Sequence, residues 1–200
     1  SSITVDLSSI YNIDIMSNDE NKTDGEFSEN YAYPAELIPD NIISDGINFA
    51  MGSRADGDMN AIVSKGQSIS LPANHGANKL YLLAASRDAD GTQTDFFVDG
   101  NASSVKVEYF ADNVGQWGTI YGPRKYRHEN VGLTATHRHD LIENRNMAYH
   151  YLYIYKYVFP IAADAQTFTL PDNEDIVIFA ITLSDNENDD VTRASSILSL

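Results

Sequence analysis

The sequence contains no cysteine and is poor in basic residues, and both shortages narrow the functions open to it. Without cysteine the chain has no disulfides, no zinc–thiolate or iron–sulfur sites and no thiol nucleophile. It has 13 Lys and Arg against 29 Asp and Glu, a formal net charge of −16. Such a surface repels phosphate backbones and anionic lipids, so we expect neither nucleic acid nor a membrane as a partner. Neutral glycans meet no such repulsion.

Long apolar runs are missing as well, and none reaches the roughly 20 residues that span a bilayer. The chain opens directly into the strand-like segment ITVDL at residues 3–7, with no signal peptide before it. We therefore expect an excised or trimmed domain. The acidic, cysteine-free composition is compatible with bacterial secretion, and we expect an extracellular or periplasmic location.

Helical periodicity is the third absence, and it decides the fold class. Short apolar or alternating runs separated by Gly, Asn, Asp and Pro are typical of β-structure. The expected strands lie at residues 3–7, 47–51, 67–71, 80–85, 96–98, 105–110, 131–136, 149–159, 167–170 and 176–183. About ten strands in 200 residues predict one all-β domain over residues 1–200, a jelly-roll-like antiparallel β-sandwich.

Tyrosines alternate along residues 149–157, YHYLYIYKY, and therefore lie on one face of the predicted strand. The same face continues into Phe159 and Ile161. We interpret it as core between the sheets because it ends in apolar residues, with one or two tyrosines exposed at its start. The alternative is an exposed platform on which sugar rings stack.

Seven segments carry a resemblance to a known family. They are VDLSS at 5–9, YPAELIP at 33–39, GQSISLP at 66–72, LYLLAAS at 80–86, GQW at 115–117, TATHRH at 134–139 and LPDN at 170–173. In this order they resemble a β-sandwich region beside the catalytic domain of bacterial α-mannosidases of the glycoside hydrolase family 38 type. The resemblance implies a non-catalytic accessory module whose partners are a glycan and the parent catalytic domain.

The sequence departs from that family in two places. Related regions often carry an Asn-Asn-Asp-Gly turn after the first strand, where this chain reads YNIDI at residues 11–15. The missing glycine changes the geometry of that turn. The zinc ion and aspartate nucleophile of such mannosidases belong to a separate catalytic domain, and nothing in this chain matches that machinery.

The richest polar cluster of the sequence is His137, Arg138 and His139, followed by Asp140 and with Glu143 nearby. The two histidines share one strand face, where a metal would bind if a carboxylate joined them. Hydrogen bonding of the three side chains to sugar hydroxyls is a second interpretation. A polar strand end that pairs with the acidic surface is a third, and spacing fixes no further ligand.

A glycine-rich stretch that precedes this cluster contains three aromatic residues: Trp117, Tyr121 and Tyr126. Glycines on both sides of Trp117 allow a loop that presents the indole to a sugar face. The alternatives for Trp117 are a plug at one end of the sandwich or an anchor in an interface with a parent enzyme.

Asp88, Asp90 and Asp95 are the candidate metal ligands, arranged around Gly91. Carboxylates at i and i+2 before a glycine suit calcium, and a structural calcium ion is the only cofactor that we consider. The full twelve-residue calcium pattern is absent, so an Asp-capped hairpin turn is the competing interpretation.

Motifs of common enzymes are absent, including the Gly-x-Ser-x-Gly elbow, the phosphate loop and the dinucleotide fingerprint. The sequence therefore predicts a non-catalytic carbohydrate-binding or accessory module of a larger glycoside hydrolase. A jelly-roll polysaccharide lyase is one alternative, because Tyr126, Arg127, His137, Arg138 and Asn144 supply its residue types. A purely structural sandwich between domains is the other.

Overall fold

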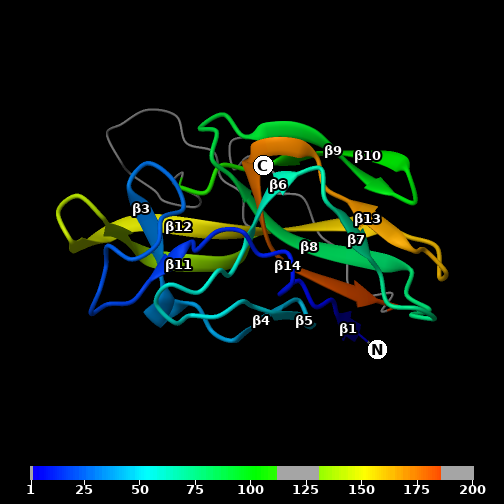
Figure 1. Ribbon diagram of the computed structural model, residues 1–200, viewed down its shortest axis with the longest axis horizontal. Coiled ribbons are helices and arrows are strands. Elements are labelled where there is room, and N and C mark those ends of the chain that lie inside the picture. Colours follow the sequence, from blue (N-terminus) through cyan, green and yellow to red (C-terminus); the bar gives the residue numbers. More distant parts are fainter. Residues whose placement is uncertain (1, 112–130, 186–200) are drawn as a thin grey trace, which may run out of the picture.

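The computed structural model describes residues 2–111 and 131–185, and in these ranges the protein is all-β apart from one 3₁₀ helix, as predicted. Figure 1 shows the strands and their order along the chain. The elements are β1 (Ser2–Thr4), β2 (Met16–Ser17), β3 (Tyr31–Pro34), η1 (Ala35–Leu37), β4 (Asn41–Ser44), β5 (Ile47–Ala50), β6 (Ile62–Lys65), β7 (Ser68–Ser70), β8 (Lys79–Ser86), β9 (Thr92–Val98), β10 (Asn101–Val107), β11 (Val131–Asp140), β12 (Arg145–Pro160), β13 (Thr167–Thr169) and β14 (Asp172–Ser184).

The largest sheet has eight strands and forms the middle of the molecule (Figure 1). Its order is β1-β14-β8-β12-β11-β3-β2, and β6 also pairs with β14. All its pairings are antiparallel except the one between β2 and β3. Strand β1 pairs with the last residues of β14, with Ser2 opposite Ser184. The sheet thus joins strands from both halves of the sequence.

A second sheet covers one face of the large sheet, in the order β10-β9-β13-β7. Phe159 of β12 packs between them against Phe96 and Phe168, with ring centroids 5.3 Å away in each case. All three rings are buried. Burial of aromatic side chains dominates the energetics of such a core, since each removes a large apolar area from water.

The β4–β5 hairpin forms a third layer on the opposite face of the large sheet (Figure 1). Thr182 of β14 donates a hydrogen bond from Oγ1 to the carbonyl of Asn48 at 2.7 Å. Lys156 of β12 is fully buried beneath the hairpin, where its ammonium group meets Ser44 and Asp45. Both faces of β12 are therefore covered along this part of the strand.

The tyrosine face of β12 is core, as predicted. Tyr153, Tyr155 and Tyr157 are buried, whereas Tyr149 at the start of the face is 80% exposed. Tyr155 donates from its hydroxyl to the Tyr109 carbonyl at 2.7 Å, and the Tyr157 hydroxyl accepts from the backbone N–H of Glu108 at 2.8 Å. The hydroxyls of Tyr155 and Tyr157 thus each meet a backbone group, which offsets the loss of their hydration.

Asp-Gly pairs make the two tightest hairpins. Asp45 and Gly46 join β4 to β5, and Asp99 and Gly100 join β9 to β10, all with positive φ. Two consecutive left-handed residues produce the turn whose twist matches that of the flanking strands, and Asp and Gly tolerate this conformation well.

All ten segments predicted as strands overlap an observed strand. The unpredicted strands are β2, β3, β4 and β6, each four residues or shorter. The stretch at residues 11–15, where the related regions carry a turn, runs extended against the chain near Ala61 instead. Ile13 bridges to Ala61, and Asn12 accepts from the backbone N–H of Val63 at 2.7 Å.

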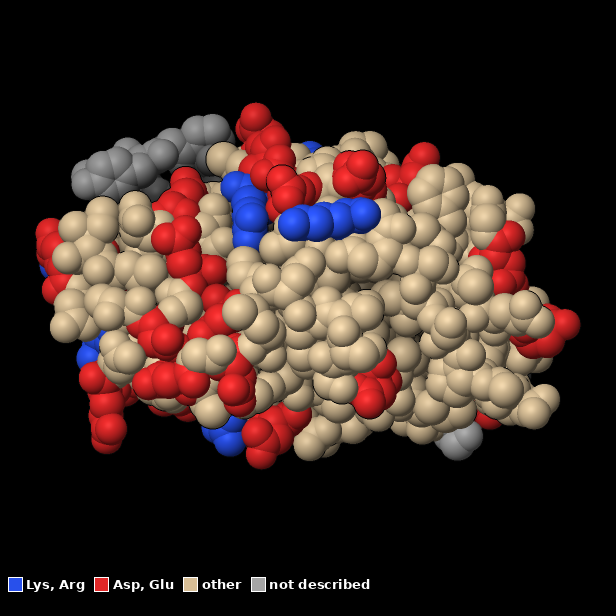
Figure 2. All heavy atoms as spheres, viewed as in Figure 1, with Lys and Arg blue, Asp and Glu red and all other residues tan. Residues whose placement is uncertain are grey.

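Acidic side chains gather over one end and along the rim of the face shown in Figure 2, and a broad area without Lys, Arg, Asp or Glu crosses its centre. The described part of the chain has no helix long and apolar enough to cross a membrane.

Candidate functional site

The two histidines predicted to share a strand face do so, and a carboxylate joins them. His137 and His139 lie on β11 with ring centroids 5.7 Å apart and an interplanar angle of 26°. Glu36 of η1 faces both rings. Its Oε1 atom lies 2.7 Å from Nε2 of His137 and 2.8 Å from Nε2 of His139. One potential ligand atom from each residue lies within 4.8 Å of the others.

The chain folds locally so that these three side chains meet. β3 pairs with the end of β11, with Ala32 opposite His139. Pro34 ends β3 and precedes η1, because a proline has no N–H to continue the sheet. The 3₁₀ turn then places Glu36 over the exposed edge of the histidine pair.

Burial differs across the cluster. His139 is fully buried, whereas the side chains of His137 and Glu36 are 20% and 29% exposed. Desolvation lowers the pKa of His139, although the hydrogen bond that its ring makes to the Glu36 carboxylate acts in the opposite direction. On the other side of the His139 ring, Nδ1 lies 2.5 Å from the hydroxyl of Ser17. The ring is thus held at both nitrogens.

Arg138 points away from the two histidines, into the opposite face of β11. Its guanidinium donates to the carbonyls of His150 at 3.1 Å and Tyr151 at 3.0 Å, and it lies 4.8 Å from the ring centroid of Tyr31. The residue is buried. It therefore braces the β11–β12 hairpin and does not share a surface with His137.

Three predicted aromatic contacts lie outside the described residues: Trp117, Tyr121 and Tyr126. Their role in sugar stacking stays a prediction.

The predicted calcium ligands lie in and beside the β8–β9 turn. Asp88 caps this turn by accepting from the backbone N–H of Asp90 at 2.9 Å, and Asp95 accepts from the Ser104 hydroxyl on β10. Within the described ranges, the grouping of three or more potential metal ligands is the one around Glu36, and it does not include these aspartates. Calcium binding by them stays a prediction.

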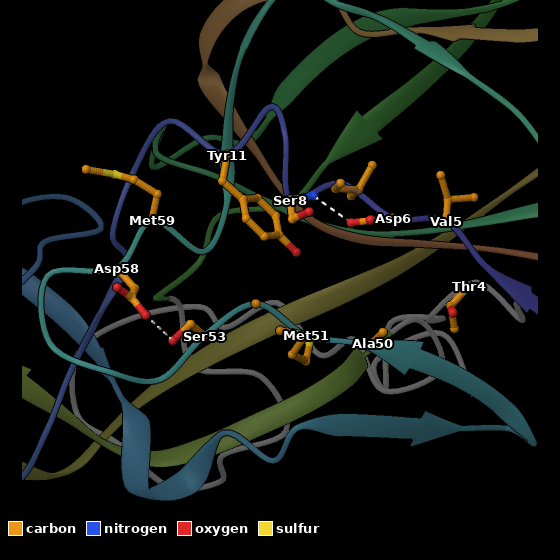
Figure 3. Close-up of a pocket in the computed structure, with 12 residues that line it drawn as sticks. Thr4, Val5, Asp6, Ser8, Tyr11, Ala50, Met51, Ser53, Asp58 and Met59 are labelled. Atoms are coloured by element: carbon orange, nitrogen blue, oxygen red, sulfur yellow. Dashed lines mark hydrogen bonds between the residues drawn. The ribbon is translucent and has the colours of Figure 1, made fainter.

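A groove of about 500 Å³ lies elsewhere on the molecule, and sequence reasoning did not find it. One wall is the N-terminal segment at residues 4–8 with Tyr11, and the other is formed by residues 50–53 with Asp58 and Met59 (Figure 3). The close-up shows the Tyr11 ring pointing into the space above Met51. Polar and apolar groups contribute about equally to its lining.

The groove is lined by groups that donate or accept hydrogen bonds. Asp6 accepts from the backbone N–H of Ser8 at 2.9 Å, which lowers the pKa of the Asp6 carboxyl. Burial and the charge of Asp6 raise the pKa of Tyr11, so its hydroxyl keeps its proton and can donate. Asp58 accepts from the Ser53 hydroxyl at 2.6 Å. A carboxylate has about four lone-pair sites, so both aspartates can accept further bonds.

Asn60 holds the second wall in place from behind the groove. Its side-chain nitrogen donates to the Ser53 carbonyl at 3.1 Å and to Asp14 at 2.9 Å, and its oxygen accepts from the N–H of Ile15. Asp14 lies next to Asp24, which in turn accepts from the N–H of Gly57. Desolvation raises the pKa of Asp14 to about 6. The wall is therefore positioned by a polar network around the buried Asn60 and the half-buried Asp14 and Asp24.

Comparison with known protein families shows which family the chain belongs to. The family model described as the AziU2-like β-sandwich domain matches residues 1–187. The chain belongs to this family. No curated protein matches the AziU2-like chain.

Among solved structures, the AziU2-like chain is similar to the catalytic domain of a GH87 α-1,3-glucanase in complex with tetrasaccharides. The identity is 10%, the match covers 64% of this chain and 22% of that chain, and the TM-score is 0.33. The present chain thus spans about a fifth of that protein. None of these matches is to an α-mannosidase, and the resemblance drawn from the seven segments stays a prediction.

Proposed function

We propose that this AziU2-like domain is a non-catalytic module that binds a neutral glycan in the groove between residues 4–11 and residues 50–59. The observation that carries the proposal is the groove itself. Its volume of about 500 Å³ lies within the range of sites for small organic ligands. Its lining combines an aromatic ring, two methionines, hydroxyls and two carboxylates.

The chemistry of this lining matches a sugar. A pyranose presents a C–H face, which packs against an aromatic ring or a thioether, and a rim of hydroxyls. Tyr11, Met51 and Met59 supply apolar surface, while Asp6 and Asp58 accept hydrogen bonds from hydroxyl groups. A hydrogen bond from a hydroxyl to a carboxylate is stronger than one between neutral groups.

The charge favours neutral over acidic glycans. Asp6 and Asp58 line the groove, and the chain carries a net charge of −16. A uronate or sulfated sugar would bring another anion next to these carboxylates, and like charges held close together are unfavourable. The same repulsion disfavours the lyase alternative, whose substrates are polyuronates.

A glycan array followed by calorimetric titration tests the proposal. We expect a neutral oligosaccharide to bind with a dissociation constant in the millimolar to high micromolar range, because few aromatic contacts are on offer. Tyr11→Ala and Asp58→Asn should each weaken this binding. Tyr149→Ala is the matched control, since Tyr149 is an exposed tyrosine that does not line the groove.

Two outcomes count against the groove. If no neutral glycan binds at millimolar concentration, the domain is not a glycan-binding module. If a glycan binds but only Trp117→Ala weakens it, the contact surface is the predicted aromatic loop and the groove is not used.

The setting of the module is part of the same proposal. A place beside a glycoside hydrolase of the α-mannosidase type, and secretion from a bacterial cell, both follow from the motif resemblance and the composition. Co-purification of this domain with a catalytic domain, or its presence in the same polypeptide, tests the first point.

A further inference from the structure

We propose that Glu36, His137 and His139 form a binding site for one divalent first-row transition-metal ion, with Zn²⁺ as the test ion. The three ligand atoms come from two elements far apart in the sequence, η1 and β11. This site is separate from the groove, because none of the three residues lines it.

Convergence of the ligand atoms is the first argument. Both Nε2 atoms approach the same oxygen of Glu36, at 2.7 and 2.8 Å. Ligands at about 2.0–2.1 Å from a tetrahedral zinc ion lie about 3.4 Å from each other. The Glu36 oxygen, now 2.7 and 2.8 Å from the two nitrogens, therefore has to move about 0.6–0.7 Å away from them for an ion to fit between the ligand atoms. Side-chain rotation of the partly exposed Glu36 can supply this movement.

The support behind His139 is the second argument. The Ser17 hydroxyl lies 2.5 Å from Nδ1 of His139, on the side of the ring away from Glu36. A metal-binding histidine usually has its second nitrogen fixed in this way, because the donated N–H leaves the lone pair on the other nitrogen. Ser17 lies on β2, whose pairing with β3 positions it.

The donor set indicates the class of ion. Two imidazoles and one carboxylate suit zinc and other late first-row divalent ions, whereas calcium and magnesium prefer oxygen ligands alone. Three protein ligands leave at least one position for water. Partial exposure of His137 and Glu36 gives this position access to solvent.

Binding of Zn²⁺ to the full 200-residue chain is measured by calorimetry and equilibrium dialysis after removal of any oligohistidine tag and of bound metal by chelation. Excess Ca²⁺ and Mg²⁺ are included because the acidic surface attracts cations in general. We expect one zinc ion per chain with a micromolar or tighter dissociation constant. Bound Co²⁺ should show the visible absorption of a four- or five-coordinate site.

Variants locate the ion. His137→Ala and Glu36→Gln are expected to remove the saturable binding, and thermal melting of each variant without metal confirms that it is folded. His150→Ala is the control, since this exposed histidine on β12 does not belong to the cluster. Ser17→Ala should keep the stoichiometry but weaken affinity about 10- to 100-fold and change the Co²⁺ spectrum.

The proposal is overturned if the wild-type chain binds no zinc in the presence of excess Ca²⁺. It is also overturned if folded His137→Ala and Glu36→Gln bind zinc as tightly as the wild type does. In either case Glu36 accepts two imidazole N–H bonds for structural reasons only. Glycan binding in the groove is measured separately, so its failure leaves this result unaffected.

Discussion

Lys156, in the middle of the large sheet, forms an ion pair with Asp45 at the tip of the β4–β5 hairpin. The lysine side chain is buried, whereas the side chain of Asp45 is 60% exposed. The ammonium group also donates to the hydroxyl of Ser44 at 3.1 Å. The β4–β5 hairpin is thus attached to the large sheet by a charge taken out of water.

Removing the charge of Asp45 should destabilise the protein more than removing the lysine. Asp45→Asn keeps the left-handed turn but leaves Lys156 without its counter-ion, and we expect a loss of roughly 1–3 kcal/mol, less than for a fully buried pair. Lys156→Met removes the buried cation, and its stability should lie within about 1 kcal/mol of that of the wild type. Urea unfolding of both single variants and the double variant measures the coupling. Equal losses in the two single variants would contradict this account.

Stability should depend on pH through Asp14. The pKa of Asp14 is raised to about 6 in the folded state, against an ordinary value of 3.8. The folded protein thus holds this proton more tightly than the unfolded chain, so the stabilising contribution is full below about pH 4 and is lost as the pH rises through 6. Asp14→Asn should therefore be more stable than wild type at pH 7, with the difference vanishing near pH 4.

Thermal melting at several pH values from 7 to below 3.8, the ordinary pKa of an aspartate, measures this difference. Asp99→Asn is the control of opposite sign, because the N–H groups of Gln166 and Thr167 lower the pKa of Asp99. Its stabilising contribution is present above the ordinary pKa and is lost as the pH falls. A constant difference between Asp14→Asn and wild type across the range would refute the assignment.

The hydroxyl of Tyr157 should be needed for stability. It accepts from the backbone N–H of Glu108 at 2.8 Å, in a buried part of the molecule. Tyr157→Phe removes this acceptor, so we expect a loss of about 1–2 kcal/mol in urea unfolding. Tyr149→Phe, at an exposed position of the same strand, should change the stability by less than about 0.5 kcal/mol. If Tyr157→Phe leaves the stability unchanged, a water molecule has taken over the role of the hydroxyl.

The second wall of the groove should not tolerate a side chain at residue 52. A Cβ atom added to Gly52 would lie 2.6 Å from the carbonyl oxygen of Asn60, so the backbone of one wall would have to shift. We expect Gly52→Ala to lower the free energy of unfolding by roughly 1–3 kcal/mol and to weaken the binding of any ligand in the groove. Gly57→Asn is the control at an open position, since nothing lies within 4 Å of a Cβ added there. Asparagine tolerates the φ of +80° at this position better than most residues, so we expect a smaller loss than for Gly52→Ala. Wild-type stability of Gly52→Ala would show that the walls move freely.

The sequence predicted the long strands well and the short ones poorly. β12 alternates tyrosines with other residues, and β14 contains a short apolar run rich in β-branched residues, and both patterns favour a strand. β3 and β4 have only four residues each, too few for a period to show, and tertiary pairing decides their conformation. The third layer explains why both faces of β12 are buried, which the alternation of tyrosines alone did not indicate.

The candidate sites differ in how far sequence could find them. The His137 and His139 pair was visible because i and i+2 residues share a strand face. Glu36 was not, because 101 residues separate it from His137 and only the β3–β11 pairing brings them together. The groove gave no signal at all, since its lining comes from two short segments of mixed polarity.

The N-terminal segment is fastened to a strand from the far end of the described chain, with Ser2 opposite Ser184 and the N–H of Val5 bonded to the carbonyl of Ile181. Contacts between such distant residues are slow to form, because closing a long loop costs conformational entropy before the contact contributes any stability. During synthesis, this wall of the groove has no partner strand until β14 has left the ribosome. Recognition of a ligand there would consequently require a chain that has been synthesised through β14, and a polypeptide interrupted before residue 172 would lack it.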